Sequence, residues 1–256
     1  MKHIDQNNIV LITASSEDAN FPATRLLDDS PKRLYKAENE NYLATLTAEI
    51  VGGCSDILIA NTNAISATVI VTDPNIMEWG DGDTWADGDE WGNTLISVSA
   101  STLQNNSSTA MLLELTNTVL VPCVAAVTLT APPGNTLYAG VMTAKISDTY
   151  GGVNPFFGYG GEPVDYSIKD ENSNGSRYYK KRDIVRNPSL SVLMLHEDAW
   201  RFEANFLERG ETPSGWKLSD MNNNYWVMYA SIDGPPSITY EDYQNSMVQF
   251  KLIEVL

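Results

Sequence analysis

Short runs of alternating or β-branched apolar residues follow one another through the first 150 residues of the chain. They are bounded by Gly, Asn, Asp, Ser or Pro, and they predict strands near residues 9–16, 42–50, 55–63, 66–73, 94–101, 110–117, 119–132 and 137–147. No stretch before residue 150 keeps an apolar period of 3.6 residues for long enough to predict a helix. Strands at this spacing are typical of a β-sandwich or barrel.

The pattern changes at residues 149–163, a segment rich in Gly, Pro and aromatic residues. Flexible linkers do not usually carry such aromatic residues, so we expect a loop that packs on a neighbour through Phe156, Phe157 and Tyr159. The residues that follow predict strands at 164–168, 177–186, 190–197, 226–233 and 247–256. A hairpin turn is predicted at 172–175, between the first two of these.

One helix is predicted, from Glu197 to Arg209. Acidic residues lie in its first turn, a basic residue lies in its last turn, and Gly210 follows as a left-handed cap. One apolar stripe, widened by two phenylalanines, predicts that the helix is buried on most sides; these residues are Trp200, Ala204, Leu207, Phe202 and Phe206. We therefore expect a mainly β protein: a sandwich over residues 1–148, then a smaller α+β part over residues 149–256 with one buried helix.

The net charge of the chain argues against one class of partner. The 256 residues carry a formal net charge of −17, which repels phosphate backbones and argues against nucleic acid as a partner. Residues 1–150 hold 6 basic and 18 acidic residues, a net −12, whereas residues 151–256 hold 10 and 15, a net −5. Apolar residues make up 43% and charged residues 19%, which predicts a globular protein with a polar, weakly charged surface.

The two cysteines and the apolar runs of the chain indicate in which cellular compartment the protein folds. Cys54 and Cys123 each lie beside an apolar run without a nearby His or Cys, so we expect two buried free thiols. The first residues lack the apolar core of a signal peptide. The longest apolar stretch, 119–131, contains Pro122 and is too short to span a bilayer. These patterns predict folding in a cytoplasm and no membrane insertion.

A Trp–Asp–Gly repeat at residues 78–93 is predicted to be an insertion between two strands. Structural packing or an interface ranks first, because Asp-Gly turns would fold the rings of Trp79, Trp85 and Trp91 back onto a sheet or a partner. A Ca²⁺ loop ranks second, because the ligand order of an EF-hand is incomplete; its ligands would be Asp81, Asp83, Asp87 and Asp89. A row of exposed rings that binds sugar ranks third. We expect no other cofactor.

Half of the basic residues of the second part lie between Arg177 and Arg186. The interpretation as a nucleic-acid site is weaker than two others, a strand pair with solvated charges or a contact with the acidic part of another subunit. The candidate contact residues are Arg177, Lys180, Lys181 and Arg182. No nucleophile, Walker or zinc pattern is present, and the two histidines, His3 and His196, suggest no base, so we expect no enzyme.

Three stretches carry a resemblance to known proteins. Residues 12–38 (ITASSEDANFPATRLLDDSPKRLYKAE) resemble the opening of discoidin-like jelly-roll modules, with Tyr35 where that family usually places Trp. Residues 55–73 resemble the following core strands. The second half, from residues 137–147 through RYYKKRDIVR and the helix to FKLIEVL, resembles the rear of structural proteins of tailed bacteriophages.

The resemblance implies a jelly roll at residues 1–148 and a smaller assembly domain at residues 149–256. It further implies a virion component of the tail or baseplate, which assembles in the host cytoplasm as a symmetric homo-oligomer and contacts other phage virion proteins. The alternative is a carbohydrate-binding module that contacts a glycan of the host cell surface.

Overall fold

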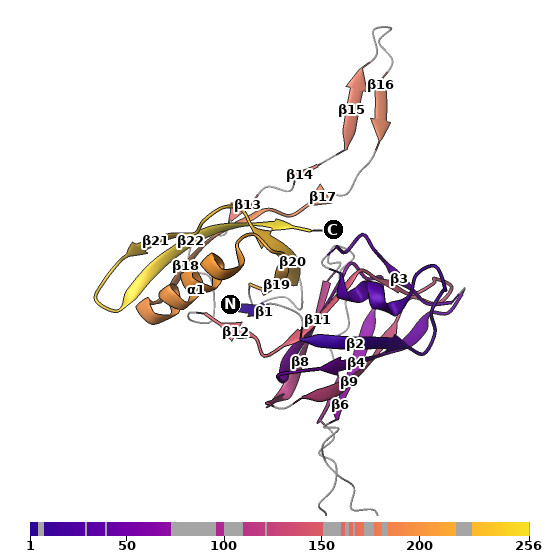
Figure 1. The fold of residues 1–256 in the computed structure, drawn as a ribbon. Coiled ribbons are helices and arrows are strands. Elements are labelled where there is room, and N and C mark those ends of the chain that lie inside the picture. Colours follow the sequence, from indigo (N-terminus) through magenta and orange to yellow (C-terminus); the bar gives the residue numbers. More distant parts are fainter. Residues whose placement is uncertain are drawn as a thin grey trace, which may run out of the picture. The chain divides into compact units, whose positions relative to one another are not determined.

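The computed structural model divides into two compact units, each with its own core (Figure 1). The sandwich unit comprises Ile4–Ser147, and the helix unit comprises Met1–His3 with Asp148–Leu256. The structure describes residues 1–4, 8–28, 30–38, 40–72, 96–99, 110–120, 122–150, 160–161, 164–165, 167–171, 177–180, 184–218 and 227–255. The chain is mainly β with one α-helix among these residues, which confirms the predicted fold class.

Two antiparallel sheets make up most of the sandwich unit. The larger has the order β2 (Ile9–Ala14), β4 (Leu43–Ile50), β9 (Cys123–Thr130), β6 (Ser66–Thr72) and β7 (Ile96–Ser99). The smaller has the order β11 (Val141–Lys145), β5 (Cys54–Ala60) and β8 (Ala110–Val119). These strands match the runs of alternating and β-branched residues, because every second side chain of a strand points to the same face.

The register of the larger sheet separates a core face from an outer face. Ile12, Ala48, Ala125 and Val71 lie side by side and are all buried. One position along, Thr13, Thr47, Ala126 and Ile70 form the next row, which is exposed or half-buried. Cys54 and Cys123 are buried free thiols in the same core, as predicted. Burial raises the pKa of Cys54 to about 12, so the thiolate that would react is strongly disfavoured.

Tyr35 belongs to the core and is inaccessible to a ligand. It lies in β3 (Tyr35–Lys36), which pairs with β10 (Tyr138–Ala139) beside the 3₁₀ helix η1 (Ala23–Leu27). Its side chain is 0% exposed and its hydroxyl donates to the carbonyl oxygen of Ser16 at 2.5 Å. The position that resembles the tryptophan of discoidin-like modules is therefore a packing position in this chain.

The helix unit is built on an eight-stranded sheet. Its order is β12 (Asp148–Thr149), β1 (Lys2–Ile4), β19 (Ser214–Lys217), β20 (Val227–Ile232), β22 (Asn245–Glu254), β18 (Pro188–Leu195) and β13 (Gly160–Gly161), with β21 (Ser237–Tyr240) also paired to β22. Lys2 pairs with Thr149 and His3 with Asp148, so the first three residues belong to this unit. The boundary predicted at residue 148 places them in the first part instead.

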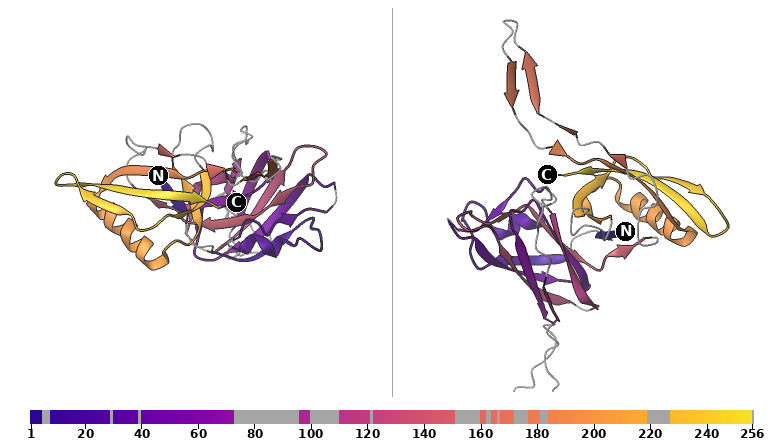
Figure 2. Two further views of the ribbon diagram at one scale, coloured as in Figure 1. Left: turned by 90° about the horizontal axis from the view of Figure 1, so that it is seen from above. Right: turned by 180° about the vertical axis from the view of Figure 1, so that it is seen from behind.

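Helix α1 (His196–Arg209) lies along one face of this sheet, as the two views of Figure 2 show. Two acidic residues lie in its first turn, Arg209 in its last, and Gly210 follows at φ 64° with its nitrogen donating to the carbonyl oxygen of Phe206. The predicted ends of the helix are thus confirmed. Its core contacts centre on Phe202, which packs on Phe250 at 5.0 Å between ring centroids.

The predicted apolar stripe of α1 is wrong. Trp200 is 57% exposed and Leu207 is 76% exposed, and Ala204 is exposed as well, whereas Ala199 and Phe202 are buried. The helix is therefore half-exposed and not buried on most sides. Apolar residues occur on both sides of α1, and the sheet selects the side that holds the two phenylalanines.

Candidate functional site

A hairpin arm, Val164–Val185, leaves the eight-stranded sheet of the helix unit (Figure 1). Its base is the pair β14 (Val164–Asp165) and β17 (Ile184–Val185), and its outer ladder is the pair β15 (Ile168–Glu171) and β16 (Arg177–Lys180). Among the described strands, each of these pairs only with its partner. The two strands of the predicted hairpin are confirmed, and its turn at 172–175 lies outside the described residues.

The arm holds the predicted basic contact residues. Arg177 lies opposite Glu171, and Lys180 lies opposite Ile168 in the ladder. Lys181 and Arg182 lie outside the described residues, between β16 and β17. Five of the eight residues of the ladder are charged, and the others are Ile168, Tyr178 and Tyr179, so the sequence offers it limited hydrophobic stabilisation of its own.

Arg186 anchors the arm where the chain returns to the sheet. Its backbone nitrogen and Nε each donate to Oε2 of Glu254 at 3.0 Å, and Nη2 contacts Oε1. The Glu254 side chain is 4% exposed and that of Arg186 is 17% exposed. Nη2 also donates to the carbonyl oxygen of Val227 at 3.4 Å. The basic segment predicted at Arg177–Arg186 thus ends in a residue whose charge is neutralised within the chain.

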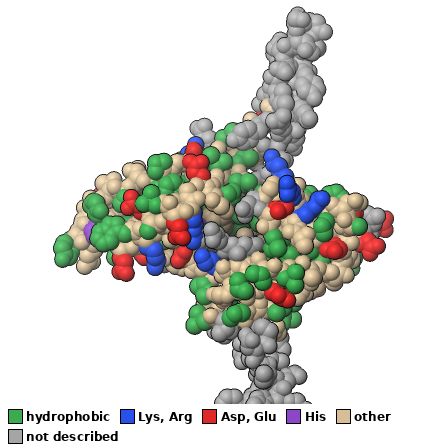
Figure 3. Space-filling view, viewed as in Figure 1, with side chains coloured by type: hydrophobic (Ala, Val, Ile, Leu, Met, Phe, Trp, Pro, Cys, Tyr) green, Lys and Arg blue, Asp and Glu red, His purple; other side chains and the backbone are tan. Residues whose placement is uncertain are grey.

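A second feature of the helix unit is a group of aromatic side chains, which we call the aromatic cluster: the half-buried His196 and the exposed Trp200, Tyr240 and Tyr243. Trp200 lies one turn after His196 on α1, and its Nε1 donates to the hydroxyl of Tyr240 on β21 at 3.3 Å. The His196 and Tyr240 rings meet edge to face at 5.2 Å. Trp200, Tyr240 and Tyr243 are 57%, 63% and 93% exposed. Figure 3 shows hydrophobic side chains gathered beside a histidine at this end of the unit.

Side chains of Asp242 and Asn245 stabilise the turn that contains Tyr243. Oδ1 of Asp242 accepts from the backbone nitrogens of Gln244 and Asn245 at 2.7 and 2.8 Å, and Oδ2 accepts from Asn245 Nδ2 at 2.9 Å. The Asn245 side chain, then the two backbone donors, lower the pKa of Asp242. Because these bonds favour the charged carboxylate, the turn keeps its shape at neutral pH.

His196 ties the same turn to the helix. Its backbone nitrogen donates to the carbonyl oxygen of Gln244 at 3.0 Å. Nε2 lies 3.2 Å from the carbonyl oxygen of Asp242, which can only accept, so Nε2 carries a proton. Nδ1 lies 2.6 Å from the Ser246 hydroxyl. Both ring nitrogens make hydrogen bonds within this part of the unit, so His196 positions the turn.

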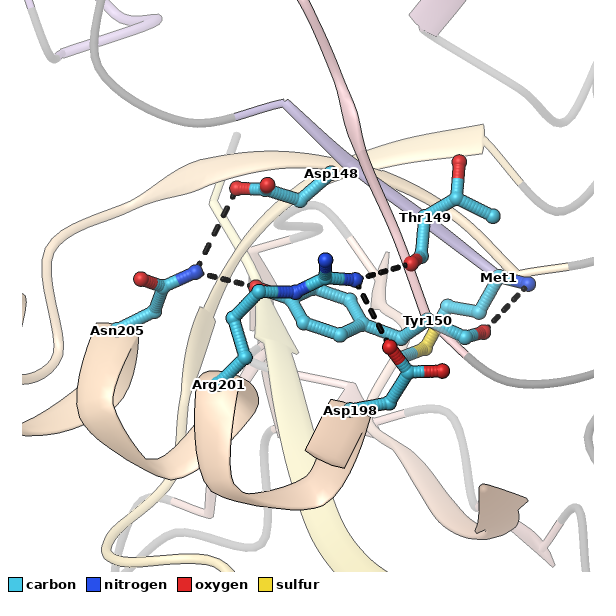
Figure 4. Close-up of polar contacts among 7 residues, drawn as sticks. All are labelled: Met1, Asp148, Thr149, Tyr150, Asp198, Arg201 and Asn205. Atoms are coloured by element: carbon cyan, nitrogen blue, oxygen red, sulfur yellow. Dashed lines mark hydrogen bonds and ion pairs between the residues drawn. The ribbon is translucent and has the colours of Figure 1, made fainter. Parts of the chain in front are cut away.

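Tyr150 connects the N-terminal strand, the start of the helix unit and helix α1 (Figure 4). Its backbone nitrogen donates to the carbonyl oxygen of Met1 at 3.0 Å, and its hydroxyl accepts from Asn205 Nδ2. The Arg201 guanidinium lies 5.2 Å from the ring centroid and donates to the carbonyl oxygen of Thr149 at 2.7 Å. Burial, then the charge of Asp148, raises the pKa of Tyr150 to about 12. The neutral phenol is favoured, which suits a structural clamp.

A serine and a histidine also lie within hydrogen-bond distance. His3 Nε2 is 2.9 Å from the Ser214 hydroxyl, a spacing suited to a nucleophile and its base. Both residues are buried, at 7% and 8% exposure, and the His3 ring stacks on buried Trp216 with 4.3 Å between centroids. The pair is part of the core, and a substrate has no access to it.

The other predicted site residues lie outside the described part of the chain. These are Trp79, Trp85 and Trp91, the carboxylates Asp81, Asp83, Asp87 and Asp89, and the aromatic residues Phe156, Phe157 and Tyr159. Within the described ranges, no group of three or more His, Cys, Asp or Glu residues is arranged to hold a metal ion. No helix in those ranges is long and apolar enough to cross a membrane.

The aromatic cluster is not among the predicted sites. Trp200 fits the predicted buried stripe of the helix, and Tyr240 and Tyr243 belong to no predicted site. A signal was present in the segment TYEDYQN (239–245), where two tyrosines flank two acidic residues. Such a polar segment between two strands predicts a turn, and a tyrosine in a turn is generally exposed.

Comparison with known proteins identifies no family. No family model matches the chain, and no curated protein matches it. Solved structures with a similar fold include a protein of the virion of a native gene transfer agent particle, at 13% identity and a TM-score of 0.32, covering 43% of this chain and 97% of that chain. They also include chitosan-binding module 1 of a chitosanase/glucanase from Paenibacillus sp. IK-5, at 14% identity and a TM-score of 0.38, covering 56% and 99%.

A third similar structure is the family 32 carbohydrate-binding module of NanJ from Clostridium perfringens in complex with galactose. It has 12% identity and a TM-score of 0.35, covering 56% of this chain and 98% of that chain. The neighbours thus include both a virion protein and carbohydrate-binding modules. At this level of similarity they decide nothing about function.

Proposed function

We propose that the chain is a structural subunit of a bacteriophage virion, of the tail or baseplate, which assembles through its hairpin arm and has no catalytic role. The observation that supports this most is the arm itself. An isolated two-stranded hairpin is marginally stable in water, and three or more strands or a covering helix are normally needed. The ladder of Ile168–Glu171 with Arg177–Lys180 has neither among the described elements. We infer that another subunit completes it.

Charge indicates which surface the arm meets. Arg177, Lys180, Lys181 and Arg182 place four basic residues in and beside β16, in a chain of net charge −17. Residues 1–150 of a second copy carry a net −12, which complements this basic segment. Charges at the rim of an interface chiefly set orientation and association rate. A repeated arm-to-acidic-surface contact between identical chains is head-to-tail, and such contacts close into a ring when the rotation permits.

The anchor at the base of the arm supports the same role. An arm that transmits a subunit contact needs a fixed origin, and the buried Arg186–Glu254 pair with its hydrogen bonds provides one on strand β22. The sequence resemblance to structural proteins of tailed bacteriophages supports placing the assembly in a virion. The protein would then be located in the virion, after assembly in the host cytoplasm.

The test is to locate the protein in purified particles. A copy with a peptide tag would be produced in cells that make the particles, and the tag would be labelled with gold for electron microscopy. We expect the label at one position on each particle, repeated with its symmetry. Particles without label, from cells in which the tagged chain is abundant and folded, would contradict a virion role.

A further inference from the structure

The aromatic cluster is exposed, and hydrogen bonds hold its Trp200–Tyr240 pair and the backbone of the turn that carries Tyr243. Trp200 and Tyr240 fix one another through the indole-to-hydroxyl hydrogen bond of 3.3 Å, which leaves more than half of each side chain exposed. Tyr243 stands in a turn fixed by Asp242 and His196, with 93% of its side chain exposed. Rigid exposed rings lose little conformational entropy on binding, so they are effective anchors for a ligand.

The polar groups beside the rings are hydrogen-bond acceptors and amides. Glu241, Asp242, Tyr243 and Gln244 are consecutive in the turn, and all are exposed. A carboxylate oxygen can accept about two hydrogen bonds; Oδ2 of Asp242 accepts one, from Asn245 Nδ2, so it can accept one more from a hydroxyl group. The two carboxylates repel sulfate, phosphate and sialic acid, whereas they accept hydrogen bonds from neutral hydroxyl and amine donors.

Charged side chains are mixed among the aromatic ones, which disfavours a protein partner. On α1, Trp200 is flanked by Glu197, Arg201 and Glu203, all exposed. A stable protein interface buries roughly 800 Å² on each partner around an apolar centre free of charged residues. A few aromatic rings bordered by carboxylates fit a smaller ligand that has both C–H faces and hydroxyl edges.

We propose that the aromatic cluster is a binding site for a glycan of neutral or amino hexoses, with sugar rings stacked on Trp200 and Tyr243 and hydroxyl groups bonded to the 241–244 turn. The C–H bonds on one face of a hexose are weak donors that meet the negative face of an aromatic ring. Such a site would let an assembled particle attach to a cell-surface polysaccharide. It uses a different part of the helix unit from the hairpin arm, so glycan binding and assembly can each fail alone.

The experiment measures binding of oligosaccharides to the full chain by titration calorimetry. The probes are cellohexaose, chitosan hexamer, N-acetylchitohexaose and a galactan oligosaccharide, with sialyllactose as an anionic probe. We expect at least one neutral or amino-sugar probe to bind and sialyllactose to bind more weakly. Trp200→Ala and Tyr243→Ala should each weaken binding by at least about tenfold, as removal of an anchoring aromatic residue does.

Three further variants make the result decisive. Trp200→Phe keeps a ring and should retain most of the affinity, which separates stacking from a general loss of structure. Tyr42→Ala removes a 45% exposed tyrosine of the sandwich unit and should have no effect. Trp85→Ala tests the Trp–Asp–Gly repeat and should also have no effect. The proposal is overturned if no probe binds, if Trp200→Ala binds as the wild type does, or if Trp85→Ala alone abolishes binding.

Discussion

Arg186 and Glu254 are 68 positions apart, and the backbone nitrogen and Nε of Arg186 both donate to one carboxylate oxygen of Glu254 at 3.0 Å. The carboxylate is almost fully buried, so its charge depends on this single partner. The pair ties the point at which the hairpin arm runs into strand β18 to the neighbouring strand β22.

We predict that Arg186→Met destabilises the protein by about 3 kcal/mol, because it leaves Glu254 buried without a counter-charge. Lys251→Met is the matched control: its ion pair with Asp233 at 2.8 Å is exposed, at 45% and 42%, and should contribute less than about 1 kcal/mol. Urea unfolding followed by circular dichroism measures both. Equal effects of the two substitutions would show that the buried pair is no anchor.

The corrected face of helix α1 gives a second prediction. Phe202→Ala should cost about 3–5 kcal/mol, because it empties a site packed against Phe250, Trp216 and Tyr150. Leu207→Ser should change stability by less than about 0.5 kcal/mol, because Leu207 is 76% exposed. The same unfolding measurement checks both variants. A larger loss for Leu207→Ser would restore the stripe that the sequence predicted.

The clamp at Tyr150 gives a prediction about pH. Its pKa in the folded protein is about 12, against about 10 for an unfolded chain. Above pH 10 the unfolded state ionises first, so the stability that Tyr150 contributes is complete below pH 10 and is lost as the pH rises toward 12. Tyr150→Phe should therefore make the melting temperature fall less steeply between pH 9 and pH 11.

Phenylalanine also loses the hydrogen bond from Asn205, but that cost is the same at every pH. The slope of melting temperature against pH is therefore the informative quantity. Tyr35, whose pKa is also raised to about 12 by burial, leaves a residual slope in the variant. Parallel curves for wild type and Tyr150→Phe would contradict the role assigned to the Tyr150 phenol.

The long strands and the ends of the helix were predictable because their signals are local. Thr45–Leu46–Thr47 and Thr128–Leu129–Thr130 alternate at a period of two, and this alternation directly reports which face is buried. Acidic residues in the first turn, with Arg209 in the last turn and Gly210 after it, similarly mark one helix. These features need no knowledge of the partner strand.

Features that depend on distant residues were not predictable. Strand β1 has three residues, and its pairing of Lys2 with Thr149 joins positions at opposite ends of the first part of the chain. Arg186 was assigned to an exposed basic patch because nothing in its neighbourhood reveals Glu254. Trp200 was assigned to the core because apolar residues occur on both sides of α1, and only the sheet decides which side it covers.

The central claim, that the hairpin arm joins subunits through its basic residues, is most directly tested by sedimentation of the purified chain at low salt, where the screening length exceeds about 10 Å. The test variant reverses three bases of the arm to glutamate, at Lys180, Lys181 and Arg182. The control variant reverses three exposed bases elsewhere, at Lys32, Arg33 and Lys251.

We predict that the wild type and the control variant form a closed oligomer at low salt that weakens as salt is added, whereas the arm variant remains a monomer. Glutamates facing an acidic surface repel it, and like charges across an interface oppose association at equilibrium; surface substitutions usually change folding stability little, so the arm variant should fold as the wild type does. An arm variant that associates like the wild type at low salt, or a wild type that stays monomeric at every concentration, would contradict the claim.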